Sequence, residues 1–318
     1  MFKINCLFTS KVNNKQYYEI YYSKNKSAKR NALKRLNKGR ILAGEFTITE
    51  DDIYKQWDLQ NGLCWYSNIP MIPYTLHNWQ CSLERKNPEF GYIRSNIVLV
   101  CLEFNGPITW ANDKIIKMYN LLQKPHEYIP VSFENINKIQ SKHRSNIESF
   151  EINNTKFVKC NKCNQIKNIN EFQKRLSSGC KSCINLYYKE KLTIPYKFFE
   201  AILRDSITRT KHRLEKDNRK GTNDHDIDIE YLIELYQKQN GLCTYSNMPM
   251  KFGSNIDYRI TIERINPLLG YIKTNICLIC WEFNTSSFET VAKNEIHGSS
   301  AWSKEKFELF MISLFIRM

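Results

Sequence analysis

Residues 60–105 read QNGLCWYSNIPMIPYTLHNWQCSLERKNPEFGYIRSNIVLVCLEFN, and residues 239–284 repeat them as QNGLCTYSNMPMKFGSNIDYRITIERINPLLGYIKTNICLICWEFN. The two stretches align without a gap at a spacing of 179 positions, and 24 of their 46 paired positions are identical. Identity of that extent does not arise by chance, so the chain contains a duplicated module. Two like modules in one chain can form an internal pseudo-dimer, and we expect that arrangement here.

The repeat continues on both sides of its best-matched stretch. Basic runs at residues 24–40 and 209–220 precede the two copies at the same place, and each leads into a segment with apolar residues at helical spacing. Downstream, residues 110–122 (WANDKIIKMYNLL) resemble residues 302–314 (WSKEKFELFMISL), with about 13 residues inserted before the second segment. The sequence therefore predicts that helices flank each module.

The composition indicates a folded protein that binds a polyanion. The length of 318 residues suggests two or three domains, and an apolar fraction of 42% is enough for folded cores. Lys and Arg outnumber Asp and Glu by 47 to 32, which gives a net charge of +15. Because this excess is clustered, we expect a nucleic-acid partner, DNA in preference to RNA, although the sequence leaves that choice open.

No segment predicts a membrane span or a secretory signal. The N-terminus lacks an apolar run, and the apolar tail at residues 307–316 is too short to cross a bilayer and predicts a packed helix. The bias toward Lys, Asn, Ile and Tyr suggests an A+T-rich gene, as in some viruses, phages and organelles. We therefore expect an intracellular protein with no membrane partner.

Four of the eleven cysteines form two pairs between the repeats. Cys160 and Cys163 make one CxxC pair, and Cys180 and Cys183 make a second one 16 residues further on. Four thiolates at this spacing can surround one Zn²⁺ tetrahedrally, and such a closed shell leaves no position for water or substrate. The sequence therefore predicts a structural zinc site in a reducing compartment.

The secondary structure expected within each copy is strand, loop, strand and helix. Residues 81–86 alternate in character and predict a strand, and Asn-Pro and Gly then punctuate a loop at residues 87–95. Residues 96–101 are rich in branched apolar residues and predict the second strand, and a helix is expected to begin in the LEFN segment. The second copy has the same pattern, with residues 260–265 as its first strand.

This order, with its string ER…GYI…NI.L.C.EFN, resembles the HNH, or ββα-metal, endonucleases. The central cysteine segment is similar to the small zinc ribbons that accompany phage members of that family. The resemblance implies an α+β fold, in which two HNH-like modules with flanking helices are separated by a zinc ribbon. The corresponding division is a first module with its basic region at residues 1–125, linker and ribbon at 126–190, and a second module at 191–318.

The resemblance also implies a metal site in each copy. In that family a carboxylate at the end of the first strand and a residue on the helix bind a divalent cation, and a loop Asn shapes the site. By position, Glu84, Glu263, Asn105 and Asn284 correspond to ligands of Mg²⁺ or Mn²⁺, and Asn96 and Asn275 to the loop residue. Such a hard cation prefers oxygen ligands and can stabilise the charge that develops on a scissile phosphate.

Both copies depart from the family pattern at the same position. Arg85 and Arg264 stand where the resemblance requires the general-base His. Arginine stays protonated and cannot accept a proton from water, although it could bind a phosphate or stabilise transition-state charge. It could equally serve the fold, with Glu84 paired to Arg85 or to a neighbour. No histidine is shared by the copies to replace the base; His77 is matched by Ile256.

Two functions therefore stay open at the level of sequence. The first is metal-dependent hydrolysis of DNA, with one module for each strand. The second is an inactive HNH-derived component that binds DNA or RNA within a larger ribonucleoprotein, for example an organellar ribosome. The half-complete CxYS motifs at Cys64 and Cys243 favour no zinc inside the modules, and we expect these cysteines, with Cys101 and Cys280, to be core residues.

Overall fold

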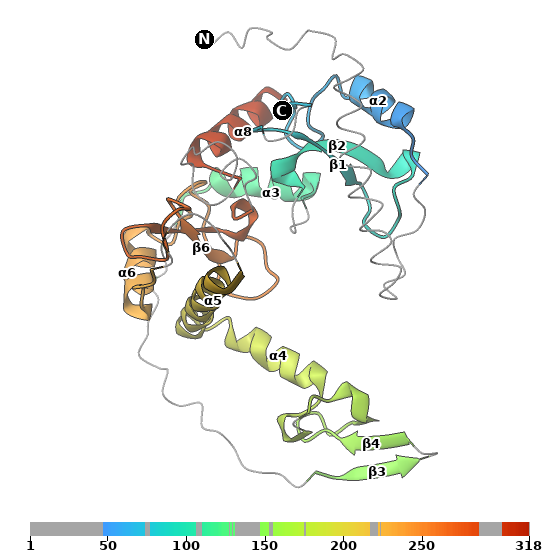
Figure 1. Ribbon diagram of the computed structural model, residues 1–318, viewed down its shortest axis with the longest axis vertical. Coiled ribbons are helices and arrows are strands. Elements are labelled where there is room, and N and C mark those ends of the chain that lie inside the picture. Colours follow the sequence, from blue (N-terminus) through green and yellow to red (C-terminus); the bar gives the residue numbers. More distant parts are fainter. Residues whose placement is uncertain are drawn as a thin grey trace.

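The computed structural model describes residues 47–73, 77–105, 110–126, 128, 130, 147–152, 155–174, 176–216, 222, 224–285 and 301–317 (Figure 1). The basic run at residues 24–40 and His297 lie outside these residues. The fold is mixed α+β, built from small antiparallel sheets and helices. No helix within the described residues is long and apolar enough to span a bilayer.

Each module is centred on a two-stranded antiparallel hairpin, as the sequence predicted. In the first module β1 (Cys81–Arg85) pairs with β2 (Ile97–Cys101), and in the second β6 (Ile260–Arg264) pairs with β7 (Ile276–Cys280). The registers are equivalent, with Leu83 opposite Leu99 and Ile262 opposite Leu278. Every residue of β2 and β7 is buried, which explains why both strands are short continuous apolar runs.

The sequence predicted that a helix begins in the LEFN segment, and the structure corrects this prediction because only a three-residue 3-10 helix forms there. Each second strand runs instead into a single 3-10 turn, η2 (Leu102–Phe104) or η6 (Trp281–Phe283), and Asn105 or Asn284 ends that turn outside the helical region. In the first copy Gly106-Pro107 follows directly, and a residue before proline is disfavoured in the helical conformation. The next α-helix of the first module, α3 (Asn112–Leu122), therefore starts further along the chain.

The amphipathic segments before the hairpins are helices, α2 (Glu50–Leu59) and α6 (Ile229–Lys238). Thr49 and Asp52 form a capping box at the start of α2, and the Asp228 side chain accepts the Tyr231 N–H at the start of α6. Ile53 in α2 and Leu232 in α6 are almost fully buried, so each helix packs against the core on the face that carries this residue. The predicted helical periodicity is therefore confirmed in both copies.

The downstream helices are exchanged between the modules. The helix α3, which follows the first hairpin, directs Lys114 to Glu282 of the second module, with Nζ 2.7 Å from Oε1. The helix α8 (Lys304–Arg317), which follows the second hairpin, directs Lys306 to Glu103 of the first module at the same distance. Figure 1 shows α8, in red, beside β1 and β2 rather than beside β6. Since Glu103 and Glu282 are equivalent positions, the exchange is reciprocal and pseudo-two-fold.

Aromatic side chains from both modules form the centre of this exchange. Phe104 and Phe283, each at the end of its 3-10 turn, contact Trp110 and Trp302 from the segments before α3 and α8. The two tryptophan rings lie 6.2 Å apart, and Trp302 Nε1 donates to the Glu103 carbonyl. All four side chains are buried, so the two modules share one hydrophobic core. The described residues thus form the internal pseudo-dimer that the duplication predicted.

The cysteine-rich segment forms a separate small unit. Three short strands, β3 (Ser149–Ile152), β4 (Thr155–Lys159) and β5 (Ile166–Asn168), make an antiparallel sheet in that order. Helix α4 (Lys181–Lys191) follows, and a three-residue connection leads into the long helix α5 (Pro195–Lys216) of the second module. The unit has its own core of Val158, Cys160, Phe172 and Cys180. In Figure 1 it lies beyond α5, at the far end from α8.

Candidate functional site

The loop between the two strands of each hairpin is fixed by one buried asparagine. Asn96 accepts the Asn87 N–H through Oδ1 and donates from Nδ2 to the carbonyls of Asn87 and Gly91. Asn275 makes the corresponding three bonds to Asn266 and Gly270. These asparagines therefore hold the shape of the loop in both modules.

The arginine that replaces the expected histidine is turned toward the same loop. Arg85 Nη1 donates to the carbonyls of Pro88 and Phe90, at 2.8 and 3.1 Å, and its guanidinium lies 5.3 Å from the centre of the Tyr92 ring. Arg264 makes the same pair of bonds, to Pro267 and Leu269. Since a buried guanidinium needs such partners, the arginine serves the loop in both modules. Among the described residues, no hydrogen-bond partner reaches the buried Arg85 Nε.

Residues on one face of β1 come together at the position expected for a metal. Ser82 and Glu84 lie two residues apart and therefore point to the same face. Asn105 reaches this face from η2, and its Nδ2 donates to Ser82 Oγ at 2.7 Å and to the Leu83 carbonyl at 2.8 Å. Glu84 Oε1 accepts the Arg85 N–H. The carboxylate of Glu84 and the amide oxygen of Asn105 are the hard donor atoms that a Mg²⁺ ion would use here.

The second module has the equivalent face on β6, but the candidate carboxylate there is shielded from solvent. Asn284 donates to Thr261 Oγ1 and to the Ile262 carbonyl, both at 3.1 Å. Glu263 is fully buried, whereas Glu84 is half-buried. Burial first and the nearby Glu263 charge second raise the pKa of the Cys277 thiol to about 12. The two modules therefore differ in how far solvent reaches the candidate carboxylate.

The four paired cysteines meet in the ribbon. The sulfur atoms of Cys160, Cys163, Cys180 and Cys183 all lie within 4.8 Å of one another, so the group could hold a metal ion. The predicted convergence of the two CxxC pairs is confirmed. Within the described residues this is the one cluster of three or more such side chains. The Cys180 N–H, 3.2 Å from Cys160 Sγ, is the kind of donor that fixes a metal-bound thiolate.

The charges of these thiols depend on one another. Burial opposes ionisation of Cys160, but backbone N–H groups of Cys163, Cys180 and Lys162 outweigh it and lower its pKa to about 6. Burial and the neighbouring thiols raise the pKa of Cys183 to about 12. Thiolates held this close repel, so all of them can be ionised together only around a cation.

The cysteines inside the modules are core residues. Cys64 and Cys101 are fully buried, and the Cys101 N–H donates to Cys64 Sγ at 3.2 Å; Cys243 and Cys280 repeat this contact at the same distance. Burial disfavours the Cys64 thiolate, but bonds from Cys101 and Ser67 outweigh it and lower the pKa of Cys64 to about 7.

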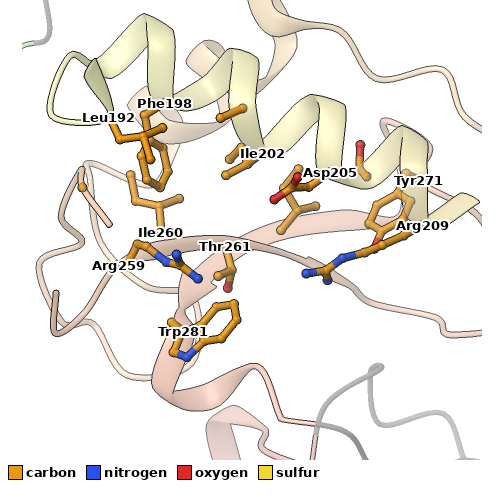
Figure 2. Close-up of a pocket in the computed structure, with 14 residues that line it drawn as sticks. Leu192, Phe198, Ile202, Asp205, Arg209, Arg259, Ile260, Thr261, Tyr271 and Trp281 are labelled. Carbon is orange, nitrogen blue, oxygen red and sulfur yellow. The ribbon is translucent and has the colours of Figure 1, made fainter. Parts of the chain in front are cut away.

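One feature was missed by sequence reasoning: a small cavity between α5 and β6 (Figure 2). Its wall carries Arg259 and Trp281, where the first copy has Gln80 and Leu102. An alignment of the two copies could have indicated this cavity, because the residues at these two positions differ in charge or size between the copies.

No protein-family model matches this chain, and neither a curated protein nor a solved structure matches it.

Proposed function

We propose that this protein binds nucleic acid as an internal pseudo-dimer of HNH-like modules, with DNA as the preferred partner. The observation that carries the proposal is the reciprocal exchange of α3 and α8, which fixes two equivalent hairpin loops about one pseudo-two-fold relation. A nucleic-acid duplex has two-fold related strands, so paired modules match its symmetry. The net charge of +15 supplies the attraction to phosphates.

The helices that join the ribbon to the second module support this proposal. Exposed basic side chains follow one another along α4 and α5, and two exposed tyrosines, Tyr187 and Tyr188, lie among those of α4. Cations track a phosphate backbone, and exposed aromatic rings can stack on bases. The exposed basic residues are Lys181, Lys189, Arg204, Arg209 and Lys211.

A second candidate function is metal-dependent phosphodiester hydrolysis, and the asymmetry of the modules favours the first module for it. Glu84 is half-buried and follows Leu83, whose carbonyl accepts a bond from Asn105, whereas Glu263 is fully buried. A Mg²⁺ or Mn²⁺ ion held there would supply Lewis-acid stabilisation of a phosphate. Glu84 and Asn105 would hold it, and Asn96 with Arg85 would keep the loop in place. The alternative, an inactive binding component of a larger ribonucleoprotein, requires only the binding surface.

The experiment that separates these functions combines binding with cleavage. Labelled DNA and RNA duplexes are titrated across salt concentrations, and we expect log K to fall linearly with log salt, by about 0.9 for each phosphate contacted on DNA. Supercoiled plasmid is then incubated with Mg²⁺ or Mn²⁺. Cleavage that Glu84→Ala abolishes and Glu263→Ala preserves supports hydrolysis in the first module. Binding without cleavage supports the inactive component, and salt-insensitive binding contradicts both.

We further propose that the metal of the four-cysteine site is Zn²⁺ in a structural role. Four thiolates satisfy the tetrahedral preference of zinc and leave no open position for chemistry. Two of the four buried residues of the ribbon core, Cys160 and Cys180, are themselves candidate ligands, so the metal would supply the folding free energy that so few apolar residues cannot. Metal analysis of the purified protein tests this directly, with one zinc per chain as the expected result.

A further inference from the structure

The cavity between α5 and β6 has the chemistry of an anion site. It encloses about 90 Å³, which is room for several water molecules and therefore for a phosphate group. Figure 2 shows Arg209 on α5 and Arg259 before β6 reaching toward the space above Thr261, with the Trp281 ring below Arg259. The Arg259 guanidinium lies 4.1 Å from the centre of that ring. Stacking on the indole fixes the plane in which its N–H donors point.

Arg259 is a partly desolvated cation. Burial lowers its pKa, and the carboxylates of Asp205 and Glu282 oppose that shift, while Arg209 adds to it. Two guanidinium groups that repel each other at a partly buried position are stabilised by an anion placed between them. Glu282 is already bonded to Lys114 and to the Tyr258 N–H, so its carboxylate is occupied by the contact between α3 and the second module.

The floor of the cavity touches the candidate metal face of the second module. Thr261 Oγ1 accepts the Asn284 Nδ2 bond and donates to the Ile279 carbonyl, so its hydroxyl is a fixed part of the wall rather than a ligand. Glu263 lies two residues further along β6, on the same face as Thr261. Thr261 therefore links the cavity wall to Asn284, whereas Asn284 and Glu263 themselves lie outside the cavity lining.

We propose that this cavity binds one phosphate group of a nucleic-acid backbone through Arg209 and Arg259. The inference rests on the proposed nucleic-acid binding and adds an asymmetry to it. The first module has Gln80 and Leu102 in place of Arg259 and Trp281, so its equivalent wall lacks both the cation and the ring on which it stacks. The second module is therefore the one that anchors the backbone here, whereas the first offers the more accessible carboxylate.

Asp205 tunes this site. It lines the cavity one helical turn before Arg209, and its carboxylate favours the charged form of Arg259 in the free protein while it opposes an incoming phosphate. Removal of this negative charge should therefore tighten phosphate binding. This expectation distinguishes a phosphate site from a merely structural cluster, in which loss of Asp205 would bring no gain.

The test uses the full chain and fluorescence anisotropy with a short labelled DNA duplex. Arg259→Gln installs the residue of the first copy, and Arg209→Gln removes an exposed cation with little risk to folding. The matched control is Lys117→Gln, which removes one positive charge from an exposed position of α3, outside the cavity and outside the basic helices α4 and α5. We expect each cavity variant to weaken binding roughly tenfold or more, the control less than about twofold, and Asp205→Asn to tighten it.

A second arm distinguishes the source of the phosphate. Inorganic phosphate and a nucleoside monophosphate are added to the wild type and to Arg259→Gln, and the thermal midpoint is measured. If both cavity variants bind the duplex as tightly as the control does, the proposal is overturned while nucleic-acid binding stands. If free phosphate stabilises only the wild type and duplex affinity is unchanged, the backbone assignment is wrong. If the wild type binds no nucleic acid, this inference and the proposed function fail together.

Discussion

The ion pairs between the modules allow a direct test of the helix exchange. Glu103 is 3% exposed and Glu282 is 1% exposed, and each is held by a lysine from the helix that follows the other module. Lys306→Met leaves the Glu103 carboxylate buried with the Trp79 N–H as a remaining donor. The loss of one partner from a buried pair costs about 3–5 kcal/mol of unfolding free energy. Lys114→Met is the matched variant, and we expect a similar cost.

Charge reversal shows which helix packs on which module. Glu103→Lys should destabilise the protein strongly, because it places two lysines together in the core. If the helices are exchanged, Lys306→Glu should recover at least about 1.5 kcal/mol of that loss, as expected for directly coupled residues. Lys114→Glu should recover nothing and should break the second pair as well. The assay is denaturant unfolding, with the slope compared among variants to verify that the same structure unfolds.

The opposite pattern would refute the reasoning. Stability recovered by Lys114→Glu and not by Lys306→Glu would mean that each helix packs on its own module. Recovery by neither would mean that Glu103 owes its stability to the backbone bond from Trp79 rather than to an ion pair. Glu103 Oε2 is buried and has no hydrogen-bond partner within the part of the chain that the structure describes, which makes this site sensitive to small shifts of α8.

Three further results are expected. Zinc chelation, or Cys163→Ser, should raise hydrogen exchange in β4 and α4 while the β1–β2 hairpin stays protected, since the ribbon has a separate core. Asn96→Ala should lower the unfolding free energy by about 2 kcal/mol because it leaves buried loop groups unpaired, and equal stability would contradict the bracing role. Burial lowers the pKa of His225, so stability should fall as the pH decreases below about 6.5, and His225→Asn should flatten that dependence in urea melts.

Much of the local structure was predictable from local patterns. Branched apolar runs gave β2 and β7, helical spacing gave α2 and α6, and the two CxxC pairs gave a four-cysteine cluster. Each of these depends on residues close in sequence or on a repeated spacing. The 3-10 turn after β2 was not predicted because the LEFN segment has no strong stop signal of its own, and the only such signal in the first copy is the Gly106-Pro107 pair that follows it.

The exchange of helices could not be read from the sequence. Lys114 and Lys306 are equivalent in the repeat, as are Glu103 and Glu282, so each lysine could pair with either carboxylate without any change in pattern. The repeat pattern alone therefore does not decide between the two pairings. The arginine at position 85 was ambiguous for another reason, because one guanidinium can serve a phosphate or a backbone carbonyl, and the structure shows two carbonyls bound.

The exchange also affects the order in which the protein can fold during synthesis. Domains usually fold in turn as they leave the ribosome. Here the surface around Trp79 and Glu103 is covered by Trp302 and Lys306, about two hundred residues later in the chain. The N-terminal module therefore cannot finish its core until Trp302 and α8 have been made. A chain that ended before α8 would leave this surface of the first module uncovered.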